Sequence, residues 1–202
     1  AKEFAICGNM NYDYQMGVST TLKYKGVSLS ADLDIRQGGV MYSRTKDINY
    51  FTGNAIQTAY NDRNTMIVPN SVNEIINADG TISYVENTTP ISSANMQAGN
   101  PGTFWGNGGF DMGSYSLIDK SYIKLRSIAL SWELPNKWLA NTPFQAVRLS
   151  AFGNNLFLWT PSDNTFVDPE MSSFGNDLEG QYGEYTANPS SRRFGFNVMV
   201  KF

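Results

Sequence analysis

Histidine and cysteine, two side chains that enzymes often use for acid–base or metal chemistry, are nearly missing from this sequence. Its 202 residues contain no histidine and one cysteine, Cys7. A Ser–His arrangement, a zinc site and an intrachain disulfide therefore cannot be built. Carboxylates remain, but no pair of them has a spacing that argues for a shared active site. We expect neither an enzyme nor a bound cofactor.

Carboxylates are concentrated in two stretches that read as loops. Residues 37–119 carry seven acids and three bases, and residues 160–191 carry six acids and no base. Calcium prefers such oxygen ligands, but the acids between 163 and 184 lack the spacing of an EF-hand, so we expect them to be solvated. Acidic loops also argue against nucleic acid as a partner, because a phosphate backbone requires a clustered basic face.

Aromatic rings in the first of these stretches are the other candidate binding groups. The segment FWGNGGF (104–110) sets rings among glycines that leave the ring faces open to a sugar or a peptide side chain. The candidate substrate contacts are Phe104, Trp105, Phe110 and Tyr115. The alternative is that the aromatic residues form a small core of the loop itself. The glycines are not a phosphate cradle, because no GxxxxGK[ST] motif is present.

Alternation of polar and apolar residues predicts the strands that position these loops. The expected strands cover residues 15–24, 27–36, 121–134, 145–159 and 192–202. Lys25-Gly26 reads as a tight hairpin turn, and a change of phase near Arg126-Ser127 predicts a β-bulge. Val27, Leu29, Leu33 and Ile35 then share one face, which we expect to meet lipid. The only helical signal is a short turn at 135–141.

The lengths of the connections favour a membrane protein. Short and long connections alternate, and the longest, residues 37–119, has 83 residues. A half-solvated sheet in a soluble protein gives the same alternation of side chains but rarely carries so long a connection. Outer-membrane barrels combine short periplasmic turns with long outer loops, and the smallest have about eight strands. We therefore expect all-β, antiparallel transmembrane β-barrel strands, the last ones of a larger barrel, with outer loops 37–119 and 160–191.

Several stretches, taken in order, resemble the SusC/RagA-type TonB-dependent outer-membrane transporters. They are YKGVSLSADLDIRQGG (24–39), SYIKLRSIALSWELPNKWL (121–139), VRLSAFGNNLFLWT (147–160), Asp168-Pro169-Glu170 and a last strand that ends in Phe202. The resemblance implies the C-terminal part of a barrel of about 22 strands. The plug domain of such a transporter would lie outside these residues. Chemistry alone gives no role for Asp168-Pro169-Glu170.

The same resemblance implies what the whole protein does. It would be a multi-pass protein of the bacterial outer membrane that imports glycans or oligopeptides. Its partners would be the lipid bilayer, a SusD-like surface lipoprotein, and the TonB complex, which it would contact through the missing N-terminal part. A structural or adhesive outer-membrane barrel is the alternative, because the strands permit it equally well.

The last strand is a candidate signal for the barrel-assembly machinery. Its alternating residues are Phe194, Phe196, Val198, Val200 and Phe202. The physical basis is strand addition, in which an unpaired edge pairs with the edge of another sheet. The alternative is that Phe202 only belongs to the aromatic girdle at the membrane surface.

Overall fold

The computed structural model describes residues 6–64, 66–91, 113–171, 173 and 182–202. The chain divides into two compact units, one made of Ala1–Ser43 with Leu117–Phe202 and the other of Arg44–Ser116.

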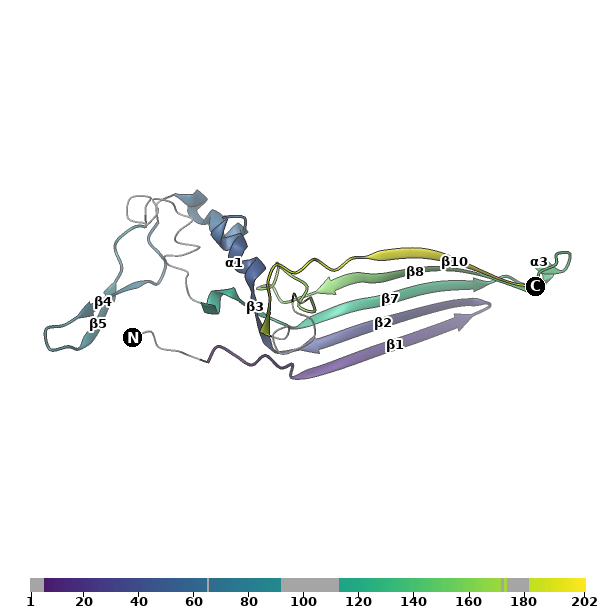
Figure 1. The fold of residues 1–202 in the computed structure, drawn as a ribbon, viewed down its shortest axis with the longest axis horizontal. Helices are drawn as coiled ribbons and strands as arrows, with labels where there is room; N and C mark the ends of the chain where they lie inside the picture. The colour runs from purple at the N-terminus through teal and green to yellow at the C-terminus, as the bar shows by residue number, and fades with distance from the viewer. Residues whose placement is uncertain (1–5, 65, 92–112, 172, 174–181) are drawn as a thin grey trace. The chain divides into compact units, whose positions relative to one another are not determined.

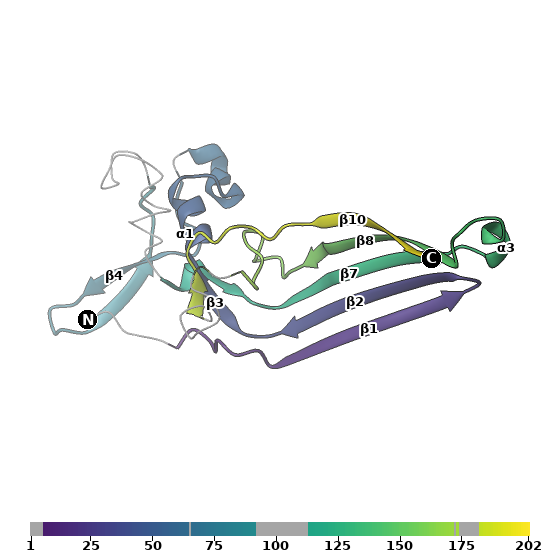
Figure 2. The ribbon, with the colours of Figure 1, turned by 45° about the vertical axis from the view of Figure 1, so that its right-hand side comes forward.

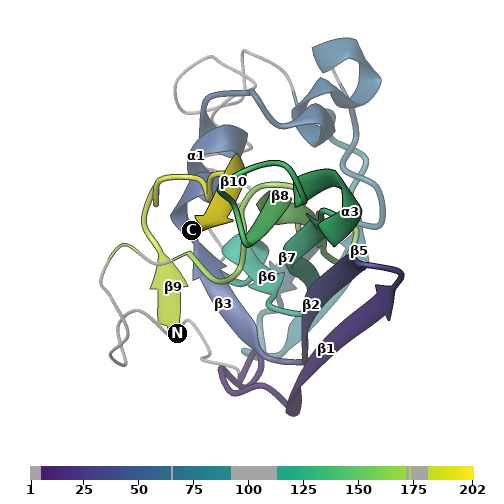
Figure 3. The same ribbon diagram turned by 90° about the vertical axis from the view of Figure 1, so that its right-hand side faces the viewer.

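The first unit contains an antiparallel sheet of five long strands (Figure 1). These are β1 (Tyr14–Tyr24), β2 (Val27–Gln37), β7 (Tyr122–Glu133), β8 (Ala146–Trp159) and β10 (Arg193–Lys201). Their order is β1-β2-β7-β8-β10, so β1 and β10 are the edges of this sheet. Each strand begins and ends within one residue of the range expected from alternation. Figure 3, in which the strands are seen nearly end-on, shows them following an arc from β1 to β10.

The turn between β1 and β2 is as tight as the sequence predicts. Tyr24 pairs directly with Val27, which leaves Lys25 and Gly26 as the only turn residues. Both have positive φ, 47° and 85°. Two successive residues with positive φ define a type I′ turn, whose twist matches that of the two strands. This turn fixes the register of the whole hairpin.

The predicted bulge in β7 is confirmed and falls at Arg126. Ser127 pairs with Asp32 of β2, and Leu125 pairs with Leu33, so Arg126 is an extra residue without a partner of its own. The register between β7 and β8 shifts at the same place. The bulge puts the side chains of both Arg126 and Ser127 on the polar face, where each bonds to a different aspartate of β2.

A short helix, α3 (Asn136–Leu139), lies in the connection between β7 and β8, within the range predicted to turn. The ring of its Trp138 packs edge-on against Trp132 of β7, with 5.4 Å between ring centroids. This contact holds the connection against the end of the strand.

A smaller sheet, visible beyond the ends of β2 and β7 in Figure 2, was not predicted. It consists of β3 (Val40–Ser43), β6 (Leu117–Asp119) and β9 (Gly183–Glu184). β3 runs antiparallel to β6 and parallel to β9. Met41 of β3 and Ile118 of β6 are almost fully buried, as is Tyr122 at the start of β7, and these three are among the few buried apolar side chains of the described residues. Strands of two to four residues are too short for a period of two to be recognised.

The second unit shows that residues 44–116 are not simply a loop. It contains α1 (Arg44–Phe51), the 3₁₀ segments η1 (Ile56–Arg63) and η3 (Gly113–Ser116), and a hairpin of β4 (Val72–Ile76) and β5 (Ile82–Glu86). α1 was not expected from the sequence, because two helical turns are too few to show a 3.6-residue period. No helix among the described residues is both long enough and apolar enough to cross a membrane.

The type I′ turn gives a first prediction. An added Cβ at Gly26 would lie 3.1 Å from the carbonyl oxygen of Glu133, in a backbone conformation that L residues rarely adopt. Gly26→Ala in the full-length polypeptide should therefore lower the free energy of unfolding by about 1–2 kcal/mol. Denaturation in detergent micelles, followed by tryptophan fluorescence, measures this change.

Gly17→Ala is the matched control. A Cβ added at Gly17 meets no atom within 4 Å, and its φ is not positive. This variant should be as stable as the parent protein or slightly more stable. Equal losses of stability in the two variants would contradict the role given to the turn.

Candidate functional site

The five-stranded sheet has one apolar and one polar face, because side chains alternate along each strand. An apolar row of directly paired residues crosses all five strands: Leu22, Leu29, Leu130, Ala151 and Phe196. The next row along the strands projects from the opposite face and is polar: Lys23, Ser28, Ser131, Ser150 and Asn197. Val27, Leu33 and Ile35 share the face of Leu29, as the sequence predicts.

The apolar face is not covered by a core of the described residues. The side chains of Leu22, Leu130 and Phe196 are 63%, 51% and 88% exposed. In a soluble half-solvated sheet this face would be covered by a core, whereas in a membrane barrel it faces lipid.

Aromatic residues lie at both ends of the apolar face. Trp132 and Tyr24 are next to the β1–β2 turn, and Phe157 stacks on Trp159 at the opposite end with 5.6 Å between ring centroids. Two aromatic bands on either side of an apolar zone are typical of strands that cross a bilayer. Phe202 lies near the turn end, where its ring is 5.4 Å from that of Phe144.

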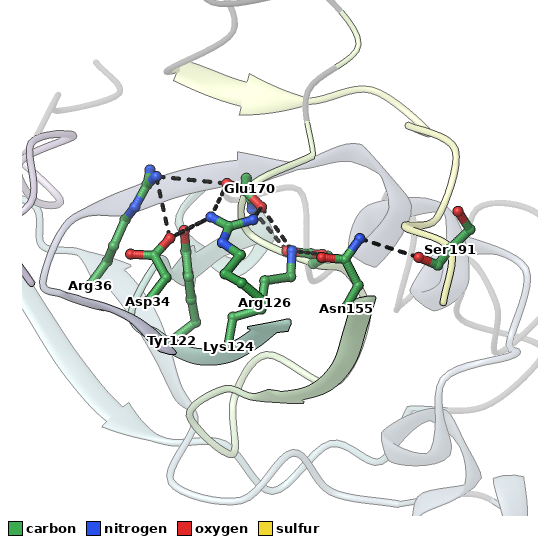
Figure 4. Close-up of polar contacts among 9 residues, drawn as sticks. Asp34, Arg36, Tyr122, Lys124, Arg126, Asn155, Glu170 and Ser191 are labelled. Atoms are coloured by element: carbon green, nitrogen blue, oxygen red, sulfur yellow. Dashed lines mark hydrogen bonds and ion pairs between the residues drawn. The ribbon is translucent and has the colours of Figure 1, made fainter. Parts of the chain in front are cut away.

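The polar face carries a cluster of charged groups at the end of the sheet opposite the β1–β2 turn (Figure 4). We call it the ion cluster; it consists of Asp34, Arg36, Lys124, Arg126, Asp168 and Glu170. The first four come from β2 and β7, and the last two from the segment that follows β8.

Arg126 makes the most side-chain hydrogen bonds of the ion cluster. Its guanidinium donates to both carboxylate oxygens of Glu170 and to Oδ2 of Asp34. The hydroxyl of Tyr122 donates to the same oxygen of Asp34 at 3.0 Å. Arg126 thus joins β2 to the segment after β8, and the bulge described above is what gives it the room to do so.

Lys124 lies deeper and is almost completely buried. Its Nζ donates to Oδ2 of Asp168 at 2.6 Å and to Oε2 of Glu170 at 2.8 Å. The side chains of Lys124 and Asp168 are 3% and 4% exposed, against 29% and 28% for Arg126 and Glu170. The ion cluster therefore has a buried inner pair and a more open outer part.

The segment that supplies the two carboxylates is a structured turn. The backbone N–H of Glu170 donates to Oδ1 of Asp168, and the N–H of Met171 donates to the carbonyl of Asp168. Upstream, Asn164 is buried, and its Oδ1 accepts from the N–H of Val167. These bonds present Asp168 and Glu170 side by side to the strands, which is the role that the sequence alone did not give to Asp168-Pro169-Glu170.

The charges in the ion cluster determine the protonation of Glu170. Partial burial alone would raise the pKa of its carboxyl, but the hydrogen bonds from Arg126 and Lys124 outweigh burial and lower the pKa to about 2. Glu170 is therefore ionised at any physiological pH, as its bidentate contact with Arg126 requires.

The expectation that the acids between 163 and 184 are solvated is wrong for several of them. Asp168 is buried in the ion cluster, and Glu184 is fully buried in β9, where it accepts a hydrogen bond from Ser43. The contacts of Asp168 and Glu170 are with side-chain cations. Among the described residues, no group of three or more Asp, Glu or Cys side chains is arranged to hold a metal ion.

Only one of the candidate substrate contacts falls within the described residues. Tyr115 lies in η3 and is 45% exposed, while Phe104, Trp105 and Phe110 lie outside the described residues. Their contact with a substrate stays a prediction. Phe194, Phe196, Val198 and Val200 all project from the apolar face of the edge strand β10, and their role in barrel assembly also stays a prediction.

The sequence comparisons find TonB-dependent receptors. TonB-dependent receptor P26 of Formosa agariphila is 24% identical over 198 residues, which cover 96% of this chain and 17% of that protein. TonB-dependent receptor P3 of the same organism is 31% identical over 91 residues, 43% of this chain and 9% of that protein. The chain thus spans less than a fifth of these relatives. No protein-family model matches it.

The structural comparisons find the RagAB peptide importer. Its closed-closed state is matched with a TM-score of 0.61 at 18% identity, over 98% of this chain and 18% of the other. Its open-open state is matched with a TM-score of 0.53 at 18% identity, over 93% and 17%. The expected fold class, antiparallel strands of a transmembrane β-barrel, is confirmed. The resemblance to SusC/RagA-type TonB-dependent transporters is confirmed as well.

The low pKa of Glu170 gives a second prediction. A carboxyl whose pKa falls from its ordinary 4.5 to about 2 on folding stabilises the folded state above pH 4.5 and loses this effect as the pH falls toward 2. The segment after β8 should therefore stay bound to the strands at pH 5–8 and loosen between pH 4.5 and 2. A fluorophore on Thr165→Cys, in a Cys7→Ser background, reports the change, since Thr165 is exposed.

Two variants test whether Glu170 causes this transition. Glu170→Gln has no carboxyl to titrate at this position, so its segment after β8 should change less between pH 4.5 and 2. The segment should already be more loosely bound at neutral pH than in the parent protein. Glu133→Gln removes a carboxylate that pairs with Arg148 on the same face outside the ion cluster, and should leave the transition unchanged. A transition of full size in Glu170→Gln would contradict the assignment.

Proposed function

We propose that this chain is part of the wall of a TonB-dependent importer in the bacterial outer membrane. The observation that carries the proposal is the match to a TonB-dependent receptor over 96% of the chain. The exposed apolar face with its two aromatic bands supports a position in the bilayer. The cargo is a glycan or an oligopeptide, and of these the similarity to the RagAB peptide importer favours an oligopeptide.

The five strands form one sector of the barrel in this proposal. An open sheet is not viable in hydrocarbon, because each unpaired backbone group there costs several kcal/mol. The edges of β1 and β10 therefore pair with further strands of the same barrel. The apolar face meets lipid, and the polar face lines the interior.

The remaining parts of the chain take up the two sides of the membrane. The turn at Lys25-Gly26 and the connection containing α3 face the periplasm, and residues 37–119 and 160–191 face the outside. A SusD-like surface lipoprotein meets the outer side. The TonB complex acts on a part of the protein outside these residues, and the barrel-assembly machinery recognises β10.

Dependence on TonB separates this function from that of a structural or adhesive barrel. Deleting the gene and deleting TonB should each abolish uptake of the same labelled glycans or oligopeptides, because both remove one energy-driven route. Uptake assays in the native host, with a passive porin substrate as the control, measure this. Uptake that requires the gene but not TonB would contradict the proposal.

The topology is tested separately with epitope tags. A tag in the β4–β5 turn, between Asn77 and Thr81, should bind antibody on intact cells. A tag in the β1–β2 turn should bind only after the outer membrane is opened. The reverse pattern would invert the topology and leave the transport function to be judged by the uptake assay.

A further inference from the structure

The ion cluster is balanced only because the segment after β8 is bound to it. The strands alone contribute Arg36, Lys124 and Arg126 against the single carboxylate of Asp34. Asp168 and Glu170 bring the two remaining negative charges. Without them, this part of the polar face would hold three cations and one anion, an excess of two positive charges.

The two segment carboxylates are not held equally. Asp168 pairs with Lys124 in a buried contact, and separating such a pair leaves a buried charge without a counter-charge. Glu170 lies in the outer part, where its side chain and that of Arg126 are each more than a quarter exposed. More exposed pairs are weaker and exchange more readily. Lys124, which also donates to Glu170, keeps its bond to Asp168 when Glu170 leaves. The Glu170 contact can therefore open while Asp168 stays in place.

Arg36 has hydrogen-bond donors that the ion cluster does not use. Its Nη2 is 3.6 Å from Asp34 and 3.7 Å from Glu170, beyond hydrogen-bond distance. Its buried Nε has no hydrogen-bond partner within the described residues. The guanidinium is fixed in place by the rings of Tyr12 and Tyr122, each 5.4 Å from its Cζ. It is thus a positioned donor with capacity left for an acceptor.

We propose that Arg36 and Arg126 form a recognition site for a carboxylate-bearing solute, and that Glu170 occupies this site as a built-in competitor. The chemistry of the site sets the ligand class. A guanidinium matches a carboxylate through two parallel hydrogen bonds, and Arg126 binds both oxygens of Glu170 in this way. A solute carboxylate that replaces Glu170 would take over these bonds and could also bond to Arg36. This inference rests on the proposed function only in that the polar face lines an import path.

The decisive variant is Glu170→Gln, which removes the competing charge and keeps the size of the side chain. In the full-length protein in detergent, it should bind N-acetyl-tri-alanine about tenfold more tightly than the parent protein does. The C-terminal amide of the same peptide lacks the carboxylate and should show no such gain. Calorimetric titration measures both affinities without any transport.

A second pair of probes identifies the source of the carboxylate. Trigalacturonate carries carboxylates and its fully methyl-esterified form carries none, so the two form an acid and neutral pair like the two peptides. If Glu170→Gln gains affinity only for the peptide acid, the carboxylate comes from a peptide terminus. If it gains affinity only for the uronate, the carboxylate comes from an acidic glycan. A gain in affinity for both shows that the carboxylate itself is recognised. All three outcomes support the site. Equal affinities of Glu170→Gln for acid and neutral probes would overturn it.

Two further variants keep the test independent of folding. Arg36→Gln, made together with Glu170→Gln, should reduce the gain, and it removes no hydrogen bond between Arg36 and the segment. Glu133→Gln breaks an exposed pair with Arg148 on the same face and should change nothing. A gain of full size without Arg36, or a gain that also occurs in Glu133→Gln, would contradict the proposal. Loss of TonB-dependent uptake bears on the proposed function and leaves these affinities untouched.

Discussion

Backbone pairing between antiparallel strands is the constraint on which the rest of this structure depends. In hydrocarbon, no water is available to satisfy an N–H or C=O group, so every such group must find a partner strand. Once β1, β2, β7, β8 and β10 are paired in register, the period of two puts one set of side chains on each face. The apolar row and the polar row, and with them the position of the charged groups that the strands contribute to the ion cluster, follow from that register.

The polar face can carry charged side chains, which the apolar face cannot. A lysine or arginine that faces lipid at the bilayer midplane costs about 2–4 kcal/mol, whereas the same residue on the inner face can be paired. Lys124 and Arg126 use this freedom to bind a segment that is 44 to 46 residues further along the chain. The charged side chains of β7 thus fix the position of the segment that follows β8.

Sequence reasoning predicts the parts of this fold that local periodicity encodes. Alternation located the long strands, the dipeptide Lys25-Gly26 located the turn, and the phase change located the bulge at Arg126. It did not locate β3, β6 and β9, which are too short to show a period. The ion cluster was missed for a different reason. Asp34 and Arg126 are 92 residues apart, and no local pattern indicates that they meet.

The resemblance to known transporters pointed to Asp168-Pro169-Glu170, but physical chemistry alone gave it no role. Its role depends on the partners, Lys124 and Arg126, which only the three-dimensional structure brings to it. A signal was present in the sequence all the same. Two bases in β7, on the polar side of an expected strand, require counter-charges if they are buried, and the nearest base-free acidic segment is 160–191.

The bulge at Arg126 lets one strand carry two opposite phases of alternation. On one side of Arg126 the even-numbered residues, Tyr122 and Lys124, lie on the polar face, and on the other side the odd-numbered residues do. Without Arg126, Leu125 and Ser127 would follow each other directly. They already pair with consecutive residues of β2, so every remaining side chain would keep its face. The loss of this residue would therefore remove the link between Asp34 and Glu170 and leave the alternation of the strand intact.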